Sequence, residues 1–268
     1  MTEADAIEAV DEPGTVSSLA AAFRSLGIGA GDTLLVHSSL SSLGWVAGGP
    51  QAVVDALQDV LTPEGTLVMP THSTQYSDPE GWENPPVPDE WIQLIRDQMP
   101  PYRPDVTPTR GMGAIPECFR TYPGVVRSDH PLFSFAAWGA DADAVVDGHD
   151  LEYGLGEGSP LARVYDRDGD VLLLGVGHDR NTSLHLAEYR ADFETELDHS
   201  SAPLLRDGER VVVEFDDIEI DSDDFDAVGA DFESEVGLTE GPVGAATAKH
   251  ASQVELVDFA VDWFEEHR

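Results

Sequence analysis

The segment GVGHDRNTSLHLAEYRA, residues 175–191, places a histidine and a glutamate at a spacing that suits proton transfer. Asn181 and Thr182 are residue types that begin helices, so His185 falls in the first turn of the expected helix and Glu188 follows on the same face. The positive end of the helix dipole disfavours an imidazolium there, and a neutral imidazole accepts a proton. The Glu188 carboxylate can hold one tautomer of the ring or anchor a cationic substrate. The alternative interpretation is a surface pair that contributes about 0.2–0.5 kcal/mol.

Parallel strands are the elements expected to position this pair. Residues 170–177 are typical of an apolar strand, and residues 34–36 and 66–69 indicate two more that are joined by an amphipathic helix. Strand, helix and strand with short links form a parallel crossover unit, and ligands of such units bind beyond the carboxyl ends of the strands. His37 to Ser39 and Thr71 to Ser73 follow two of these strands, so polar chemistry is expected at that edge of the sheet.

Several other segments complete the expected fold, which is a single three-layer α/β domain over residues 1–268. Its central sheet is mainly parallel or mixed and flanked by helices, with a small antiparallel C-terminal β segment. The further elements are an amphipathic helix between Thr15 and Gly27, a helix near residues 115–121, a strand at 133–139, antiparallel strands at 209–220 and a C-terminal helix at 252–267.

Two stretches of the sequence show less helical or strand periodicity than the rest. Residues 75–110 are rich in Pro, Trp and Asp and predict a long irregular loop of the kind that closes over substrates. Residues 209–235 predict an acidic β edge. Selectivity for a substrate is expected in these stretches.

The charge of the chain is strongly negative. Its 52 acidic residues outnumber 14 basic ones for a net charge of -38, and Lys249 is the single lysine, yet 41% hydrophobic residues are typical of a folded protein. Carboxylates spread along the whole chain favour adaptation to high salt over an acidic site tuned for a polycationic ligand. Nucleic acid is not an expected partner, since phosphate binding needs a basic patch.

The cellular setting is also bounded by composition. Cys118 is the single cysteine, which excludes an intrachain disulfide and predicts a small core residue. No apolar run approaches the ~18 residues that span a bilayer, and the acidic start is unlike a signal peptide. A cytoplasmic protein with no membrane partner is expected, and a homodimer is left open.

Histidines at loop positions raise the alternative of a metal site. His37, His72, His130 and His185 qualify, but no HExxH or other compact ligand spacing is present, so no metal is expected. The Gly-rich loops HSSLSSLG and RGMG allow backbone N–H groups to approach a phosphate or thioester, although neither matches a P-loop or dinucleotide fingerprint. The serines also lack the GxSxG pattern of α/β hydrolases.

Taken in order, these segments resemble the aminoglycoside 3-N-acetyltransferase family. The matching pieces are LLVHSSLSSLGWVAGGPQAVVDAL, GTLVMPTHS, TRGMGAIPECFR, RSDHPLFSFAAWG, GEGSPLARVYDRDGDVLLLGVGHDRNTSLHLAEYRA and GPVGAATAKHASQVELVDFAVDWF, which cover nearly the whole chain. NTSLHLAE after LLLGVG is the most specific of them.

The resemblance implies acetyl-CoA as the donor and a primary amine of an aminoglycoside as the acceptor. It assigns the catalytic base to His185, with Glu188 as its neighbour in the substrate site. It also implies that Arg110, Gly111, Met112 and Gly113, together with Ser159 in the turn 158–160, hold the pantetheine or phosphates of the cofactor.

The chemistry of amide formation fits this assignment. The acceptor ammonium must lose a proton before it attacks the thioester, and His185 can take it. The oxyanion needs donors, which we expect among the backbone N–H groups of Ser38 and Ser39 and the hydroxyl of Thr71. His37, Ser38 and Ser39 are also expected to bind the CoA cofactor. The alternatives are transfer to a non-antibiotic metabolic amine, a metal-dependent hydrolase and a non-catalytic acyl-CoA-binding protein.

Overall fold

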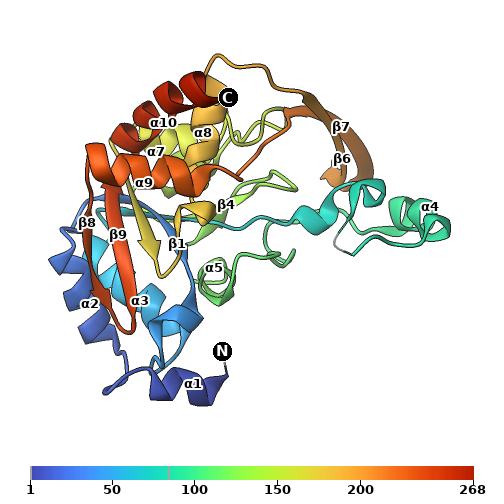
Figure 1. The fold of residues 1–268 in the computed structure, drawn as a ribbon. Coiled ribbons are helices and arrows are strands. Elements are labelled where there is room, and N and C mark those ends of the chain that lie inside the picture. Colours follow the sequence, from blue (N-terminus) through green and yellow to red (C-terminus); the bar gives the residue numbers. More distant parts are fainter. Residues whose placement is uncertain (1, 84) are drawn as a thin grey trace.

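Seven strands form one mixed sheet in the order β3-β4-β2-β1-β5-β9-β8 (Figure 1). This is seen in a computed structural model that describes residues 2–83 and 85–268. Strand β1 pairs in parallel with β2 and β5, and the other neighbours are antiparallel. The strands are β1 (Thr33–Ser38), β2 (Thr66–Pro70), β3 (Val126–Arg127), β4 (Phe135–Gly139), β5 (Asp170–Leu174), β8 (Thr239–Val243) and β9 (Ala246–Ser252).

Helices cover both faces of this sheet, which confirms the predicted three-layer α/β domain. One face carries α2 (Val16–Ser25), α3 (Pro50–Leu61) and α5 (Ala114–Phe119). The opposite face carries α6 (Ala142–Val146), α7 (Pro160–Tyr165), α8 (Ser183–Arg190), α9 (Phe225–Glu235) and α10 (Gln253–His267). Helix α1 (Glu3–Glu8) has no buried residue. No described helix is long and apolar enough to cross a membrane.

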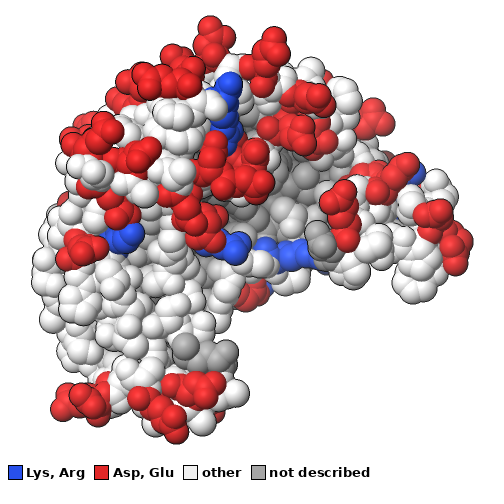
Figure 2. Space-filling model, in the orientation of Figure 1, with Lys and Arg blue, Asp and Glu red and all other residues white. Residues whose placement is uncertain are grey.

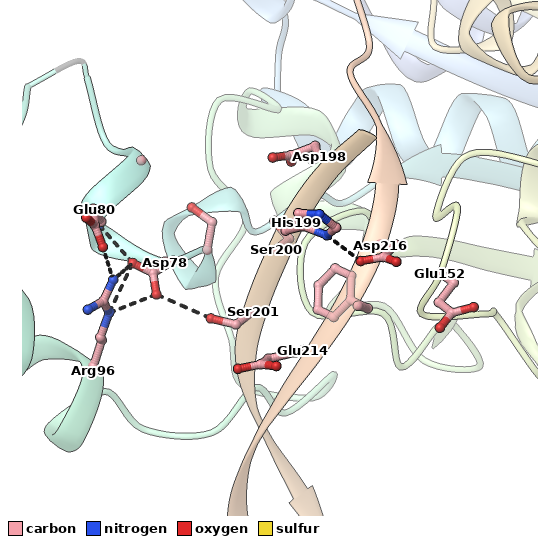
Figure 3. A pocket seen from close by; sticks show the side chains of 13 residues that line it. Asp78, Glu80, Arg96, Glu152, Asp198, His199, Ser200, Ser201, Glu214 and Asp216 are labelled. Atoms are coloured by element: carbon pink, nitrogen blue, oxygen red, sulfur yellow. Dashed lines mark hydrogen bonds and ion pairs between the residues drawn. The ribbon is translucent and has the colours of Figure 1, made fainter. Parts of the chain in front are cut away.

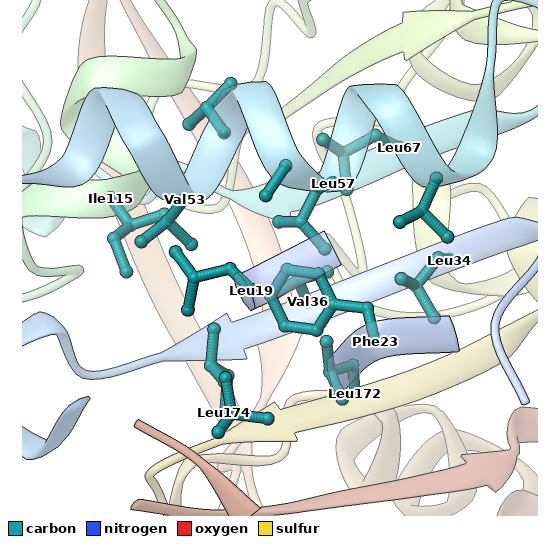
Figure 4. Close-up of a cluster of buried hydrophobic side chains, with 14 of the residues drawn as sticks. Leu19, Phe23, Leu34, Val36, Val53, Leu57, Leu67, Ile115, Leu172 and Leu174 are labelled. Atoms are coloured by element: carbon teal, nitrogen blue, oxygen red, sulfur yellow. The ribbon is translucent and has the colours of Figure 1, made fainter. Parts of the chain in front are cut away.

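Side chains of the buried strands point alternately into the two hydrophobic cores, one on each face of the sheet. Leu34 and Val36 of β1 belong to the cluster beneath α2 and α3, which Figure 4 shows, whereas Leu35 belongs to the cluster on the other face. Successive side chains of a strand point to opposite faces, so a strand buried on both sides reads as a continuous apolar run. The same geometry leaves the polar residues after each strand at the edge of the sheet.

The helix boundaries follow the expected local signals. The Thr15 hydroxyl accepts from the N–H of Ser18 at the start of α2, and Gly27 follows its end with φ 95°. Ser252 caps α10 by accepting from the N–H of Glu255. Cys118 is only half-buried in α5, whose buried residues are Ile115, Pro116 and Phe119, so the prediction of a core cysteine is wrong.

The prediction of an irregular loop at residues 75–110 is wrong in part. The segment contains the helix α4 (Asp89–Gln98), preceded by 3-10 turns at Thr74–Tyr76 and Pro79–Gly81. No residue of α4 is buried; ion pairs from Arg96 and bonds from Arg210 to the carbonyls of Arg96 and Met99 hold the helix instead. The helix was not predicted because the prolines before α4 give this segment an amino-acid composition that is typical of a loop.

The prediction of an acidic β edge at residues 209–235 is also wrong in part. Strand β7 (Glu209–Ile218) pairs with β6 (Leu197–Arg206) as a separate hairpin rather than at the edge of the main sheet. Residues 225–235 form α9, whose Phe225, Val228 and Phe232 are buried at helical spacing. The many acidic residues between them obscured that spacing.

Candidate active site

A pocket of about 400 Å³ opens where β1 and β5 end, and we call it the strand-end pocket. Two predicted groups meet in its wall: His37 to Ser39, where β1 runs through Ser38, and Gly111 to Gly113 before α5. Gly175 to Gly177, which we predicted as the end of a strand, leave β5 after Leu174 and form the third part of the wall. Gly175 has φ 69°, and a Cβ there would lie 2.7 Å from Cβ of Ser42, so the turn that closes the pocket requires glycine.

Two residues predicted to hold a cofactor are not part of the pocket wall. Arg110 donates its backbone N–H to the carbonyl of His72, and its side chain is exposed beside the wall. Ser159 is fully buried and caps α7 by accepting from the N–H of Leu161 at 3.2 Å. The capping bond explains the serine in the GSP turn, so we do not propose Ser159 as a ligand contact.

The two residues of the opening motif are in contact. Nδ1 of His185 lies 2.5 Å from Oε2 of Glu188, and the His185 and Glu188 side chains are only 12% and 0% exposed. A carboxylate accepts, so Nδ1 carries the proton and Nε2 presents a lone pair. Nε2 of His185 has no hydrogen-bond partner among the described residues. The burial of Glu188 contradicts a surface pair and leaves it no access to anchor a substrate.

The start of α8 links this pair to the strand-end pocket. Thr182 and Asn181, the two expected cap residues, precede the helix, and the Asn181 side chain accepts from the N–H of Ser183 at 3.2 Å. The Thr182 hydroxyl instead lies 3.2 Å from Nε2 of His37. His185 is therefore one helical turn from a residue in the pocket wall.

His37 and His72 are buried neutral imidazoles next to His185. Burial, followed by the nearby His185, lowers the pKa of each to about 3. Nε2 of His72 has no hydrogen-bond partner among the described residues, and its ring packs edge-on against Phe133 and Phe135. Neither ring adds charge to the site near neutral pH.

Two of the expected oxyanion donors are already engaged. The Thr71 hydroxyl is fully buried, donates to the carbonyl of Ser134 at 3.1 Å and accepts from Nε of Arg127. The N–H of Ser39 donates to the carbonyl of Leu174. The Ser38 hydroxyl, by contrast, is buried in the pocket wall without a partner among the described residues.

The four histidines named as metal ligands lie close enough to influence one another's charge, but they are not placed as a ligand set. His130 accepts at Nδ1 from the N–H groups of Leu132 and Phe133, and Nε2 faces the carbonyl of Leu151. Within residues 2–83 and 85–268, no group of three or more His, Cys, Asp or Glu side chains is placed to hold a metal ion.

A second hollow of about 850 Å³, which we call the acidic cavity, lies between the β6–β7 hairpin and the segment before α4. Figure 3 shows its carboxylates, which are Asp78, Glu80, Glu152, Asp198, Glu214 and Asp216. Arg96 pairs with Asp78 and Glu80, and His199 pairs with Asp216. Glu152, Asp198 and Glu214 have no ion-pair partner in the described part of the chain, so the cavity favours cations.

The inner end of the acidic cavity is fixed to α8. Asp216 lines the cavity, and its neighbour Asp217 accepts from the Tyr189 hydroxyl at 2.5 Å. Tyr189 follows Glu188 in the same helix. Figure 2 shows carboxylates around the hollowed face between the body and the arm of α4 and the hairpin. One helix thus connects the strand-end pocket, the His185–Glu188 pair and the acidic cavity.

Sequence reasoning missed most of this acidic wall. Glu214 and Asp216 alternate with the buried Phe215, so the predicted strand at 209–220 contained the signal that places both on one face. Asp198 lies in β6, which we did not predict, and Asp78 lies in the segment expected to be irregular. Only the fold brings these residues together.

Comparison with known proteins identifies the family of the chain. The model of the family described as aminoglycoside 3-N-acetyltransferase matches residues 35–265. The chain belongs to that family of acetyl-transferring enzymes.

Two curated relatives are similar over almost their whole length. The SPbeta prophage-derived aminoglycoside N(3')-acetyltransferase-like protein YokD of Bacillus subtilis is 48% identical, across 96% of this chain and 95% of the relative. Aminoglycoside N(3)-acetyltransferase III of Pseudomonas aeruginosa is 37% identical, across 94% of each.

Solved structures share the fold. The crystal structure of Bacillus subtilis YokD matches with a TM-score of 0.96 at 46% identity, covering 98% of both chains. AAC-IIIb in binary complex with CoASH matches at 0.86 with 31% identity, covering 95% of this chain and 97% of the other. AAC-VIa bound to sisomicin matches at 0.87 with 34% identity, covering 96% and 99%.

The burial of His72 predicts a loss of stability in acid. Below pH ~6.5 the unfolded chain binds a proton at this residue that the native state, with its pKa of about 3, does not bind. Each unit by which the pH is lowered in this range therefore reduces the free energy of unfolding by about 1.4 kcal/mol through His72 alone. We expect His72→Phe to flatten the fall between pH 6 and 4, measured by urea unfolding at fixed high salt. His199→Phe, at an exposed site, is the control, and equal slopes for wild type and His72→Phe would contradict the prediction.

Proposed function

We propose that this protein transfers the acetyl group of acetyl-CoA to the 3-amino group of an aminoglycoside, with His185 as general base. The observation that carries the proposal is the bond between Nδ1 of His185 and the buried Glu188, which leaves Nε2 as the basic atom one helical turn from Thr182 in the wall of the strand-end pocket. Membership of the family and the names of its relatives support the reaction and the acceptor class.

The strand-end pocket suits the thioester end of acetyl-CoA. Gly111 and Gly113 leave room for a ligand to approach the backbone closely, and the Ser38 hydroxyl has a donor free for the thioester oxygen. Arg180 in the wall has a side chain that is 71% exposed, and it pairs with Asp179 at 3.0 Å, so it offers the phosphates a cation only in competition with that carboxylate. The CoASH complex of AAC-IIIb supports this choice of donor by analogy.

The acidic cavity suits the acceptor. An aminoglycoside carries several ammonium groups on a sugar scaffold, and the carboxylates of Asp198, Glu214 and Glu152 offer counter-charges without partners of their own in the described residues. Salt screens distant charges, so only carboxylates that touch the acceptor contribute at high ionic strength. The sisomicin complex of AAC-VIa is a related example.

The proposed chemistry needs one base and one oxyanion donor. Nε2 of His185 takes a proton from the acceptor amine, directly or through a water, as the nitrogen attacks the thioester carbonyl. The Ser38 hydroxyl donates to the oxyanion of the tetrahedral intermediate. The C–S bond then breaks, and the imidazolium returns the proton to the departing sulfur. Glu188 holds the tautomer and stabilises the imidazolium in between.

Assays of thiol release distinguish this function from the alternative acceptors and activities. A non-antibiotic amine would use the same base and donor, and a panel of aminoglycosides and simple amines distinguishes it. An acyl-CoA-binding protein would bind acetyl-CoA and release no thiol with any amine. A metal-dependent hydrolase would release thiol without an amine, and it would need a metal-ligand set, which is not found among the described residues.

Replacing the base tests the proposal. We expect His185→Gln to lower kcat by about 10²–10⁴-fold, the usual contribution of a general base, and to leave the KM for acetyl-CoA unchanged. Thiol release from acetyl-CoA in high salt measures both, and His267→Gln on the surface is the matched control. A His185→Gln enzyme with the wild-type kcat would refute the assignment.

Replacing an acidic wall residue tests the acceptor site. We expect Glu214→Gln to raise the KM for an aminoglycoside up to about five-fold, because one exposed ion pair contributes at most about 1 kcal/mol. The KM for acetyl-CoA should stay unchanged. Glu209→Gln, in the same strand but outside the cavity wall, is the control. If both variants bind the aminoglycoside like the wild type, the acceptor binds elsewhere.

A further inference from the structure

Glu188 contacts a second cation on the side away from His185. Its Oε2 accepts from His185, and its Oε1 accepts from Nη1 of Arg268 at 2.5 Å and from the N–H of Asp221 at 3.0 Å. Both side chains are withdrawn from solvent, since the Arg268 side chain is 13% exposed and that of Glu188 is 0% exposed. Arg268, Glu188 and His185 therefore form a continuous buried row of charge and hydrogen bonds.

Arg268 is held in place by more than Glu188. Its Nε and Nη2 reach the two carboxylate oxygens of Asp224, with Nε at 2.9 Å from Oδ2, and Nη2 also donates to the carbonyl of Asp221. Its guanidinium carbon lies 4.0 Å from the centre of the Phe264 ring, in the last turn of α10. A forked guanidinium makes all these contacts at once, which the single ammonium of lysine does not. The position of this residue is thus fixed on three sides.

We propose that Arg268 is a positioning residue for acetyl transfer: it fixes the Glu188 carboxylate against His185 and offsets its charge. This inference rests on the proposed role of His185 as the base. A buried carboxylate is strongly disfavoured without cationic partners, and its charge holds a proton on an adjacent imidazole. Arg268 shares that charge, which weakens the attraction between the carboxylate and an imidazolium at His185.

Other titratable groups face the pair from every neighbouring element. His37 from β1 and His72 after β2 stay neutral because their pKa values are about 3. Burial raises the pKa of Tyr189 in α8, so its hydroxyl stays neutral. Two carboxylates, Asp221 and Asp224, precede α9. His178 is close enough to His37 to contribute to the low pKa of that residue. In the described chain, Arg268 is the one arginine or lysine bonded to Glu188.

Arg268→Gln tests the effect on charge. Without the guanidinium, the pair binds its inactivating proton more tightly, so the acid limb of the kcat/KM profile for the amine should move to higher pH by about one unit. At pH 7 we expect kcat to fall about ten-fold, with the KM for acetyl-CoA unchanged. Arg190→Gln is the matched control, because Arg190 ends α8 and pairs with the exposed Glu157. An acid limb at the wild-type pH in Arg268→Gln would overturn the proposal.

Arg268→Lys tests the geometry and keeps the charge. We expect its acid limb to stay at the wild-type pH while kcat falls several-fold, because an ammonium cannot hold Asp224 and Glu188 in the same fork. A wild-type kcat in this variant would contradict positioning, and that result would stand even if Arg268→Gln does not fold. Imidazole ¹⁵N shifts of His185, titrated by NMR, report the protonation midpoint without turnover.

Failure of this inference is distinguishable from failure of the proposed function. His185→Gln is assayed in the same series. An active His185→Gln enzyme would remove the base on which both depend. An inactive His185→Gln enzyme, together with an Arg268→Gln enzyme whose pH profile is that of the wild type, would leave the base in place and reject Arg268 alone.

Discussion

The bond between His185 and Glu188 is the interaction on which the site depends. It fixes which imidazole nitrogen is basic, and it depends on the burial of Glu188 within the helix layer on one face of the sheet. That burial depends on α10, which packs on α8, and on the segment before α9, whose Asp221 N–H bonds Glu188. The reactive nitrogen is therefore positioned by the whole C-terminal face of the fold, and α8 itself supplies only the spacing of the two residues.

The molecule contains carboxylates in two different environments. Glu188 is buried, accepts hydrogen bonds on both carboxylate oxygens, and positions His185. The carboxylates of the acidic cavity are open to solvent, and several have no ion-pair partner among the described residues. The net charge of -38 conceals this difference, because composition counts both kinds alike. Which carboxylates bind a cation is decided by exposure and by the lack of competing partners.

Local patterns predicted the parts of the fold and site that local physics determines. The crossover from β1 to β2, the strand before the motif, the cap at Thr15 and the contact of His185 with Glu188 follow from periodicity and spacing. Helix α4 was missed because its stabilising contacts come from Arg210, more than a hundred residues away. Thr71 and Ser159 have side chains of the right type, but their hydroxyls are engaged in bonds that only the folded chain reveals.

A structure of the enzyme with CoA and an aminoglycoside tests the central claim most directly. We predict that the 3-amino nitrogen lies within hydrogen-bond reach of Nε2 of His185, directly or through one water, with the CoA sulfur in the strand-end pocket and the remaining amines in the acidic cavity. An acceptor amine bound out of reach of Nε2, with another side chain next to it as base, would contradict the role of the His185–Glu188 pair.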